Sequence, residues 1–128
     1  MNPTHTIRAD PQQKLVDITL AGLFDVPRVI RLAIEVKAAI DSLALARHEH
    51  LALIDASDFS LQSQDVISAL QSAFSNQHYA SRRLAVITDK TLSPMQVQRV
   101  LKRDTVQWFD NRREAEAWLC DDQPTHSP

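Results

Sequence analysis

Two short, entirely apolar runs, Leu51 to Ile54 and Leu84 to Ile87, are separated by a segment whose apolar residues recur at helical spacing. Such runs, bounded by polar residues, are typical of strands that are covered on both faces, as in a parallel sheet. Two neighbouring parallel strands need a crossover connection, and the helical segment between the runs supplies one. The chain is therefore predicted to form an α/β domain.

The N-terminal part predicts a β-hairpin. The segments 5–9 and 14–20 flank Asp10-Pro11-Gln12-Gln13, where the aspartate and the fixed φ of proline favour a turn. Apolar and polar residues alternate in the second segment, which is the pattern of a strand with one buried face. We expect this hairpin to add one antiparallel edge to a mostly parallel sheet.

The first helix is predicted to begin after Asp25, which can cap it, with Pro27 in its first turn. Six apolar residues that follow at helical spacing are expected to form its buried face. They are Val29, Ile30, Ala33, Ile34, Ile40 and Leu43.

Three further helices are expected. Ser63 can cap the second, Ser93-Pro94-Met95-Gln96 has a cap and a proline suited to begin the third, and Asp110 or Asn111 can begin the last. A final strand is predicted at residues 105–109. The predicted order is β-β-α-β-α-β-α-β-α, with four helices and a sheet of four or five strands.

Length and composition predict one domain at residues 5–120, with flexible tails at 1–4 and 121–128. The formal net charge is −2, so no excess of positive charge favours nucleic-acid binding. Apolar stretches fall far short of the roughly 20 residues of a membrane-spanning helix. A single cysteine, Cys120, and the lack of a charged-then-apolar leader predict a cytoplasmic location.

The single glycine, Gly22, argues against nucleotide cofactors, because phosphate-binding loops need several glycines. We predict no cofactor, and a turn as the role of Gly22. His48-Glu49-His50 has suitable metal ligands, but alternate residues of a loop do not converge on one ion, so no metal site is predicted there. Cys120 comes at the end of the last predicted helix and is expected to be an incidental residue rather than a catalytic nucleophile.

Two other groups of charged residues are candidate sites. Four aspartates that follow predicted strands could hold Mg²⁺, or cap helices and stabilise turns. They are Asp25, Asp55, Asp89 and Asp110. The basic pairs Arg82-Arg83, Lys102-Arg103 and Arg112-Arg113 could form a patch for an acidic partner, although solvated surface positions are the more ordinary role of such pairs.

Three segments resemble a known family. They are Leu53-Ile54-Asp55 leading into residues 61–66, L-S-P-M-Q-V-Q-R at 92–99, and R-E-A-E-A-W-L at 113–119. Together they resemble STAS-like (SpoIIAA-like) bacterial domains, which are related to anti-sigma-factor antagonists and more distantly to CRAL-TRIO lipid-binding domains. The resemblance extends from the hairpin to Trp118.

The resemblance implies a binding surface at the start of the second helix, formed by Gln62, Ser63, Gln64 and Asp65, with Gln96 and Arg99 on the third helix as neighbours. In the antagonists a serine of an Asp-Ser-Ser-Gly-like turn is phosphorylated. Ser63 occupies the matching region and is the candidate phosphoacceptor, but the glycine and the other neighbours of that motif are missing.

The function predicted first is a non-catalytic regulatory module that binds a protein partner, without a phosphoserine switch. Two alternatives stay open at this point. The CRAL-TRIO kinship allows a carrier or sensor of a lipid or other small apolar ligand, and the strand-end aspartates allow an Mg²⁺-dependent phosphate-handling enzyme. A homodimer through the exposed edge of the hairpin is a further option.

Overall fold

The computed structural model describes residues 2–45, 49–59, 62–73, 81–88 and 106–120. Within these ranges the chain forms five strands and three helices. In chain order they are β1 (Thr4–Asp10), β2 (Leu15–Gly22), α1 (Val26–Ser42), β3 (Leu51–Phe59), α2 (Gln64–Ala73), β4 (Arg83–Ile87), β5 (Val106–Phe109) and α4 (Arg112–Cys120). The helix predicted from Ser93 and the predicted C-terminal tail lie outside the described residues.

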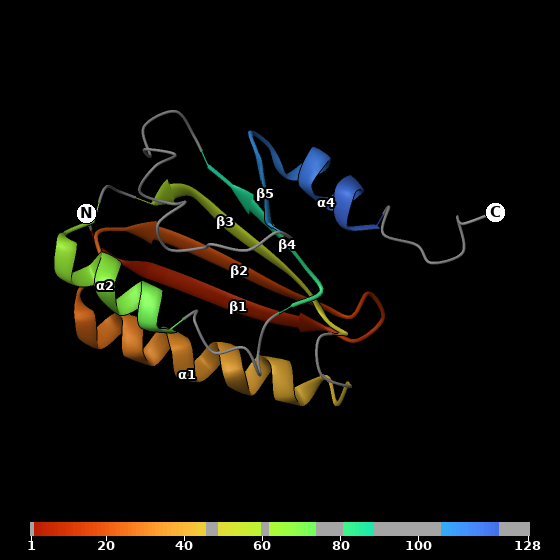
Figure 1. Ribbon diagram of the computed structural model, residues 1–128, viewed down its shortest axis with the longest axis horizontal. Coiled ribbons are helices and arrows are strands. Elements are labelled where there is room, and N and C mark those ends of the chain that lie inside the picture. Colours follow the sequence, from red (N-terminus) through yellow and green to blue (C-terminus); the bar gives the residue numbers. More distant parts are fainter. Residues whose placement is uncertain (1, 46–48, 60–61, 74–80, 89–105, 121–128) are drawn as a thin grey trace.

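The five strands form one mixed sheet in the order β1-β2-β3-β4-β5 (Figure 1). β1 and β2 pair antiparallel, which confirms the predicted hairpin, and the other three pairings are parallel. Asp10 stabilises the hairpin turn, because its Oδ1 accepts hydrogen bonds from the backbone N–H groups of Gln12 and Gln13. β1 lies at one edge of the sheet; pairing of two copies there stays a prediction.

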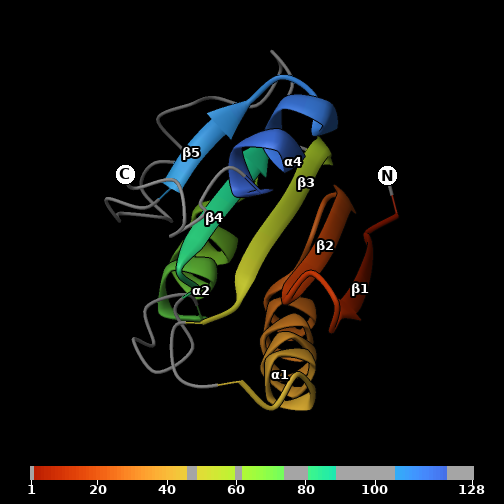
Figure 2. The same ribbon diagram turned by 90° about the vertical axis from the view of Figure 1, so that its right-hand side faces the viewer.

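Helices cover both faces of the sheet (Figure 2). α1 and α2 lie on one face, and α4 lies on the other, over β3, β4 and β5. Alternation along the strands divides the apolar side chains accordingly. Ile18, Ile54 and Val86 belong to the larger core beneath α1 and α2, whereas Leu53 and Ile87 belong to the smaller core beneath α4.

The prediction for α1 is right about its cap and partly wrong about its buried face. Asp25 accepts a hydrogen bond from the N–H of Arg28 at 2.9 Å and is the N-cap. Val29 is buried as expected, but Ile30 and Ile34 are 56% and 63% exposed. Apolar residues lie on more than one side of this helix, so helical spacing alone fits more than one buried face.

Several boundaries differ from those predicted. β3 continues past Ile54 to Phe59, because Asp55 and Ser57 lie on a face of the sheet that is partly open, where polar side chains do not end a strand. β1 begins at Thr4, inside the segment predicted to be a tail. The start of α4, in contrast, agrees with the prediction, because Oδ1 of Asn111 accepts a hydrogen bond from the N–H of Glu114 at 2.9 Å and caps the helix.

Among the described residues, no helix combines the length and the apolar character required to cross a lipid bilayer. The cytoplasmic location stays a prediction.

Candidate functional site

A buried glutamine connects two loops at the end of the sheet where β2 and β3 finish. The side chain of Gln62 accepts a hydrogen bond from the backbone N–H of Phe24 at 2.9 Å and donates one to the carbonyl oxygen of Gly22 at 3.1 Å. These are the backbone groups on either side of Leu23. Gln62 thereby fixes the turn between β2 and α1 against the start of α2. Its side chain, predicted to face a partner, is buried in the fold.

The turn held by Gln62 depends on Gly22. Its φ is +84°, in the left-handed region that favours glycine, and a Cβ built on it would lie 2.5 Å from the carbonyl oxygen of Asn2. The turn role predicted for Gly22 is therefore confirmed. Phe24 anchors the far side of the turn, because its ring packs edge-on against Phe59 with the ring centroids 5.1 Å apart.

The first residues of α2 are exposed beside this turn. Ser63 caps the helix as predicted, since its Oγ accepts from the N–H of Val66 at 3.3 Å. Ser63, Gln64 and Asp65 are exposed, and Leu23 is half-exposed. We refer to these four residues as the α2 edge. Gln96 and Arg99, the other two predicted site residues, lie outside the described residues.

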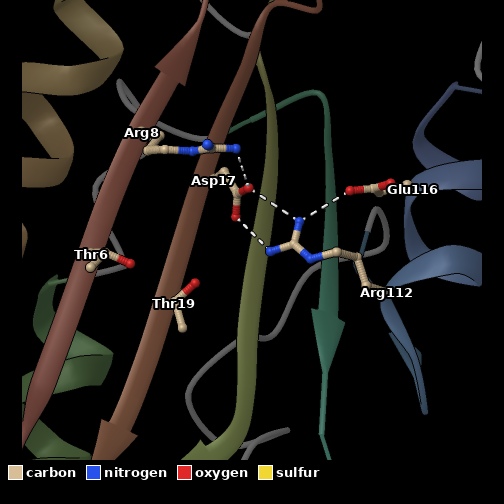
Figure 3. Close-up of a pocket in the computed structure, with 6 residues that line it drawn as sticks. All are labelled: Thr6, Arg8, Asp17, Thr19, Arg112 and Glu116. Atoms are coloured by element: carbon tan, nitrogen blue, oxygen red, sulfur yellow. Dashed lines mark hydrogen bonds and ion pairs between the residues drawn. The ribbon is translucent and has the colours of Figure 1, made fainter.

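A second site, which sequence reasoning missed, lies on the opposite face of the sheet. α4 does not cover β1 and β2, and beside it the sheet forms a hollow of about 510 Å³ (Figure 3). The residues that line it are Thr6, Arg8, Asp17, Thr19, Arg112 and Glu116, and we call this the polar hollow. The lining residues of β1 and β2 are the polar members of an alternating polar and apolar pattern. This alternation is the sequence signal that could have revealed the hollow.

A charged pair forms the centre of the polar hollow. Arg112 donates from Nη1 to Oδ2 of Asp17 at 3.1 Å and from Nη2 to Oδ1 at 3.0 Å, a bidentate pair that connects α4 to β2. Nη1 also donates to Glu116 at 3.1 Å. The hydrogen bond to Asp17 is the largest cause that raises the pKa of Arg112 above its ordinary value, so the guanidinium stays charged.

The strand-end aspartates that the structure describes have individual local surroundings. Asp25 caps α1, and Asp55 Oδ1 accepts hydrogen bonds from the N–H and hydroxyl groups of Ser57, at 3.1 and 2.6 Å. Asp110 is exposed after β5, and Asp89 is not described. In the part of the chain that the structure describes, no three His, Cys, Asp or Glu residues are grouped closely enough to hold a metal ion.

The other candidate groups are also dispersed. His50 is buried, and His48 lies outside the described ranges. Arg83 stacks on Trp118, with 4.4 Å from Cζ to the ring centroid, and donates to the carbonyl oxygen of the same residue at 2.7 Å. Arg112 is held by Asp17, and Lys102-Arg103 is not described. In two of the three basic pairs, one arginine therefore holds α4 against the sheet.

Comparison with known proteins identifies the fold. The structure is similar to an anti-sigma factor antagonist from Mycobacterium paratuberculosis, with a TM-score of 0.64 and 11% sequence identity, over 94% of this chain and 96% of that chain. It is also similar to an uncharacterized protein of the DUF3478 family from Shewanella loihica that has a SpoIIAA-like fold. There the TM-score is 0.64 and the identity 20%, over 94% of this chain and 97% of that chain.

At the sequence level, no family model and no curated protein matches the chain. Identities of 11% and 20% over nearly the whole of both chains define a shared architecture rather than a shared activity. The sheet and helices described above, together with these two similarities, confirm the resemblance found in the sequence: the chain has the STAS-like, or SpoIIAA-like, fold.

Proposed function

We propose that the protein is a non-catalytic regulatory module that binds a protein partner through the α2 edge. The observation that carries this proposal is the pair of hydrogen bonds from buried Gln62 to the backbone on either side of Leu23. They hold exposed residues from two loops in one fixed arrangement before any partner arrives. Binding then costs less conformational entropy than it would with two independent loops.

The chemistry of the α2 edge suits a protein surface. Leu23 offers an apolar side chain, Gln64 an amide that donates and accepts hydrogen bonds, and Asp65 a carboxylate. A complementary partner would present a small apolar pocket next to an arginine or lysine. The similarity to an anti-sigma factor antagonist supports a protein partner of the regulatory kind.

The proposed binding does not depend on phosphorylation of Ser63. The hydroxyl of Ser63 accepts the hydrogen bond that caps α2, and the sequence around it lacks the glycine of the antagonists' phosphorylated turn. Asp65, two residues away, would repel an added phosphate. Ser63→Asp keeps a capping side chain and adds a charge, so it tests this point without removing the cap.

We expect Gln64→Ala to weaken partner binding about tenfold, which is the effect of losing one interfacial hydrogen bond. Asp65→Ala should weaken binding at least as much, because hydrogen bonds to a charged group are stronger. The Kd is measured by isothermal titration calorimetry of the full chain with purified anti-sigma factors from its source organism. Glu114→Ala is the matched control, because Glu114 is also an exposed acid in the first turn of a helix, on the opposite face of the sheet. It should change the Kd less than twofold, and Ser63→Asp less than threefold.

The proposal is wrong if none of these anti-sigma factors binds, or if Glu114→Ala weakens binding as much as Asp65→Ala. A Kd that rises more than tenfold in Ser63→Asp, with Asp65→Ala near wild type, would instead indicate a phosphoserine switch.

An apolar binding cavity and an Mg²⁺ site, which the two alternative functions require, have no support among the described residues. Among the described residues, the aspartates considered for Mg²⁺ belong to no group of three or more metal-ligating side chains, and Asp25 and Asp55 are engaged in local hydrogen bonds. The polar hollow is lined by hydroxyl and charged groups, which do not suit an apolar ligand.

A further inference from the structure

We propose that the polar hollow binds the phosphoryl group of a small molecule or a lipid headgroup. The hollow includes Arg112 and Glu116 of α4 and so lies on the face of the sheet opposite α1 and α2, which makes this inference independent of the α2 edge and of a protein partner. It follows from which hydrogen-bonding groups of the lining are already engaged and which are available.

The carboxylates of the hollow are engaged. Both oxygens of Asp17 accept from Arg112, at 3.0 and 3.1 Å, and Oδ2 also lies 3.6 Å from Nη2 of Arg8. Oε2 of Glu116 accepts from Arg112 at 3.1 Å. Asp17 and Arg112 largely neutralise each other's charge at this distance. Both oxygens of Asp17, at the centre of the hollow, are therefore unavailable for a ligand.

The donors on the β1 side are available. The side chain of Arg8 is 83% exposed, and its one contact to Asp17 is long, so most of its five N–H donors face solvent. Thr6 lies two residues from Arg8 on the same face of β1, and Thr19 lies directly opposite Thr6 on β2. Among the described residues, neither threonine hydroxyl has a hydrogen-bond partner. Two hydroxyls and one guanidinium thus line one wall of the hollow, as Figure 3 shows.

A phosphoryl group matches this wall. Arginine donates to two oxygens of a phosphate at once, and the remaining terminal oxygen can accept from the threonine hydroxyls. Neighbouring residues on one face of a pair of strands lie about 5 to 7 Å apart, so one phosphoryl group can contact all three side chains. The ligand is expected to enter from solvent and to leave the Asp17–Arg112 pair intact.

The test is a titration of the ¹⁵N-labelled full chain with inorganic phosphate, in a buffer free of phosphate and at constant ionic strength. We expect saturable shifts of the Thr6, Arg8 and Thr19 amide signals with a Kd on the order of 1 mM. Arg8→Gln should weaken binding at least about tenfold, because it removes a charge-assisted hydrogen bond. Arg8 is so exposed that this variant should remain folded. Arg113→Gln, at an exposed arginine on α4, is the matched control and should bind as the wild type does.

Cosedimentation with vesicles of about 30% phosphatidic acid, whose headgroup is a phosphomonoester with three terminal oxygens, distinguishes the two sources of the group. Binding to phosphate alone indicates a soluble ligand, and binding to the vesicles that Arg8→Gln abolishes indicates a headgroup. The proposal is overturned if neither phosphate nor the vesicles bind. It is equally overturned if Arg8→Gln and Arg113→Gln lower binding by the same factor, because that result indicates a general charge effect.

Discussion

Arg112→Ala is expected to lower the free energy of unfolding by about 2–3 kcal/mol, and Asp17→Ala by only about 1 kcal/mol, although both remove the same ion pair. The side chain of Asp17 is 10% exposed, whereas that of Arg112 is 36% exposed. Removal of Arg112 leaves a buried carboxylate whose remaining ion-pair partner, among the described residues, is Arg8 at 3.6 Å. Removal of Asp17 leaves a guanidinium that water and Glu116 can satisfy.

Urea unfolding followed by circular dichroism measures both changes. Arg113→Ala, which removes an exposed arginine from the neighbouring position of α4, should alter stability by less than about 0.5 kcal/mol. Interaction with Asp17 raises the pKa of Arg112, so the contribution of the charged guanidinium is fully present at neutral pH and is lost as the pH rises through that pKa. Equal losses in Arg112→Ala and Asp17→Ala would contradict this account of the pair.

Gln62→Leu is expected to lower the free energy of unfolding by about 2–3 kcal/mol, because it leaves the buried N–H of Phe24 and the carbonyl of Gly22 without their partner. The substitution keeps a side chain of similar volume, so the loss reports the hydrogen bonds rather than a cavity. The same variant should weaken partner binding, since the turn that carries Leu23 is no longer held against α2.

Gln64→Leu makes the same chemical change two residues away, at an exposed position. It should alter stability by less than about 0.5 kcal/mol. If Gln62→Leu and Gln64→Leu have equal stability, Gln62 does not hold the turn, and the proposed preorganisation of the α2 edge is wrong.

The elements of the fold could be predicted from local patterns. The hairpin follows from alternation around Asp10-Pro11, and Asp25, Ser63 and Asn111 cap helices through groups three residues along the chain. The buried face of α1 could not be predicted in full. Ile30 and Val29 are adjacent apolar residues, and only packing against the sheet decides that Val29 is buried and Ile30 is exposed.

The region of the α2 edge was predicted through the resemblance, but the role of Gln62 was not. Its side-chain partners are 38 and 40 residues away in sequence, and nothing local indicates that it points inward. The polar hollow was missed for the same reason. Asp17 and Arg112 are 95 residues apart, so the pair exists only once α4 lies on the sheet. The alternating pattern of the second strand places Asp17 on its polar side, but it does not indicate the partner on α4.

The central claim is that Gln62 fixes the α2 edge as the surface that a protein partner contacts. Mapping a bound anti-sigma factor by the amide shifts of the ¹⁵N-labelled chain tests it most directly. The account predicts that the largest shifts fall at residues 22–25 and 63–66. Shifts concentrated on α4 and the polar hollow, with residues 63–66 unchanged, would contradict it.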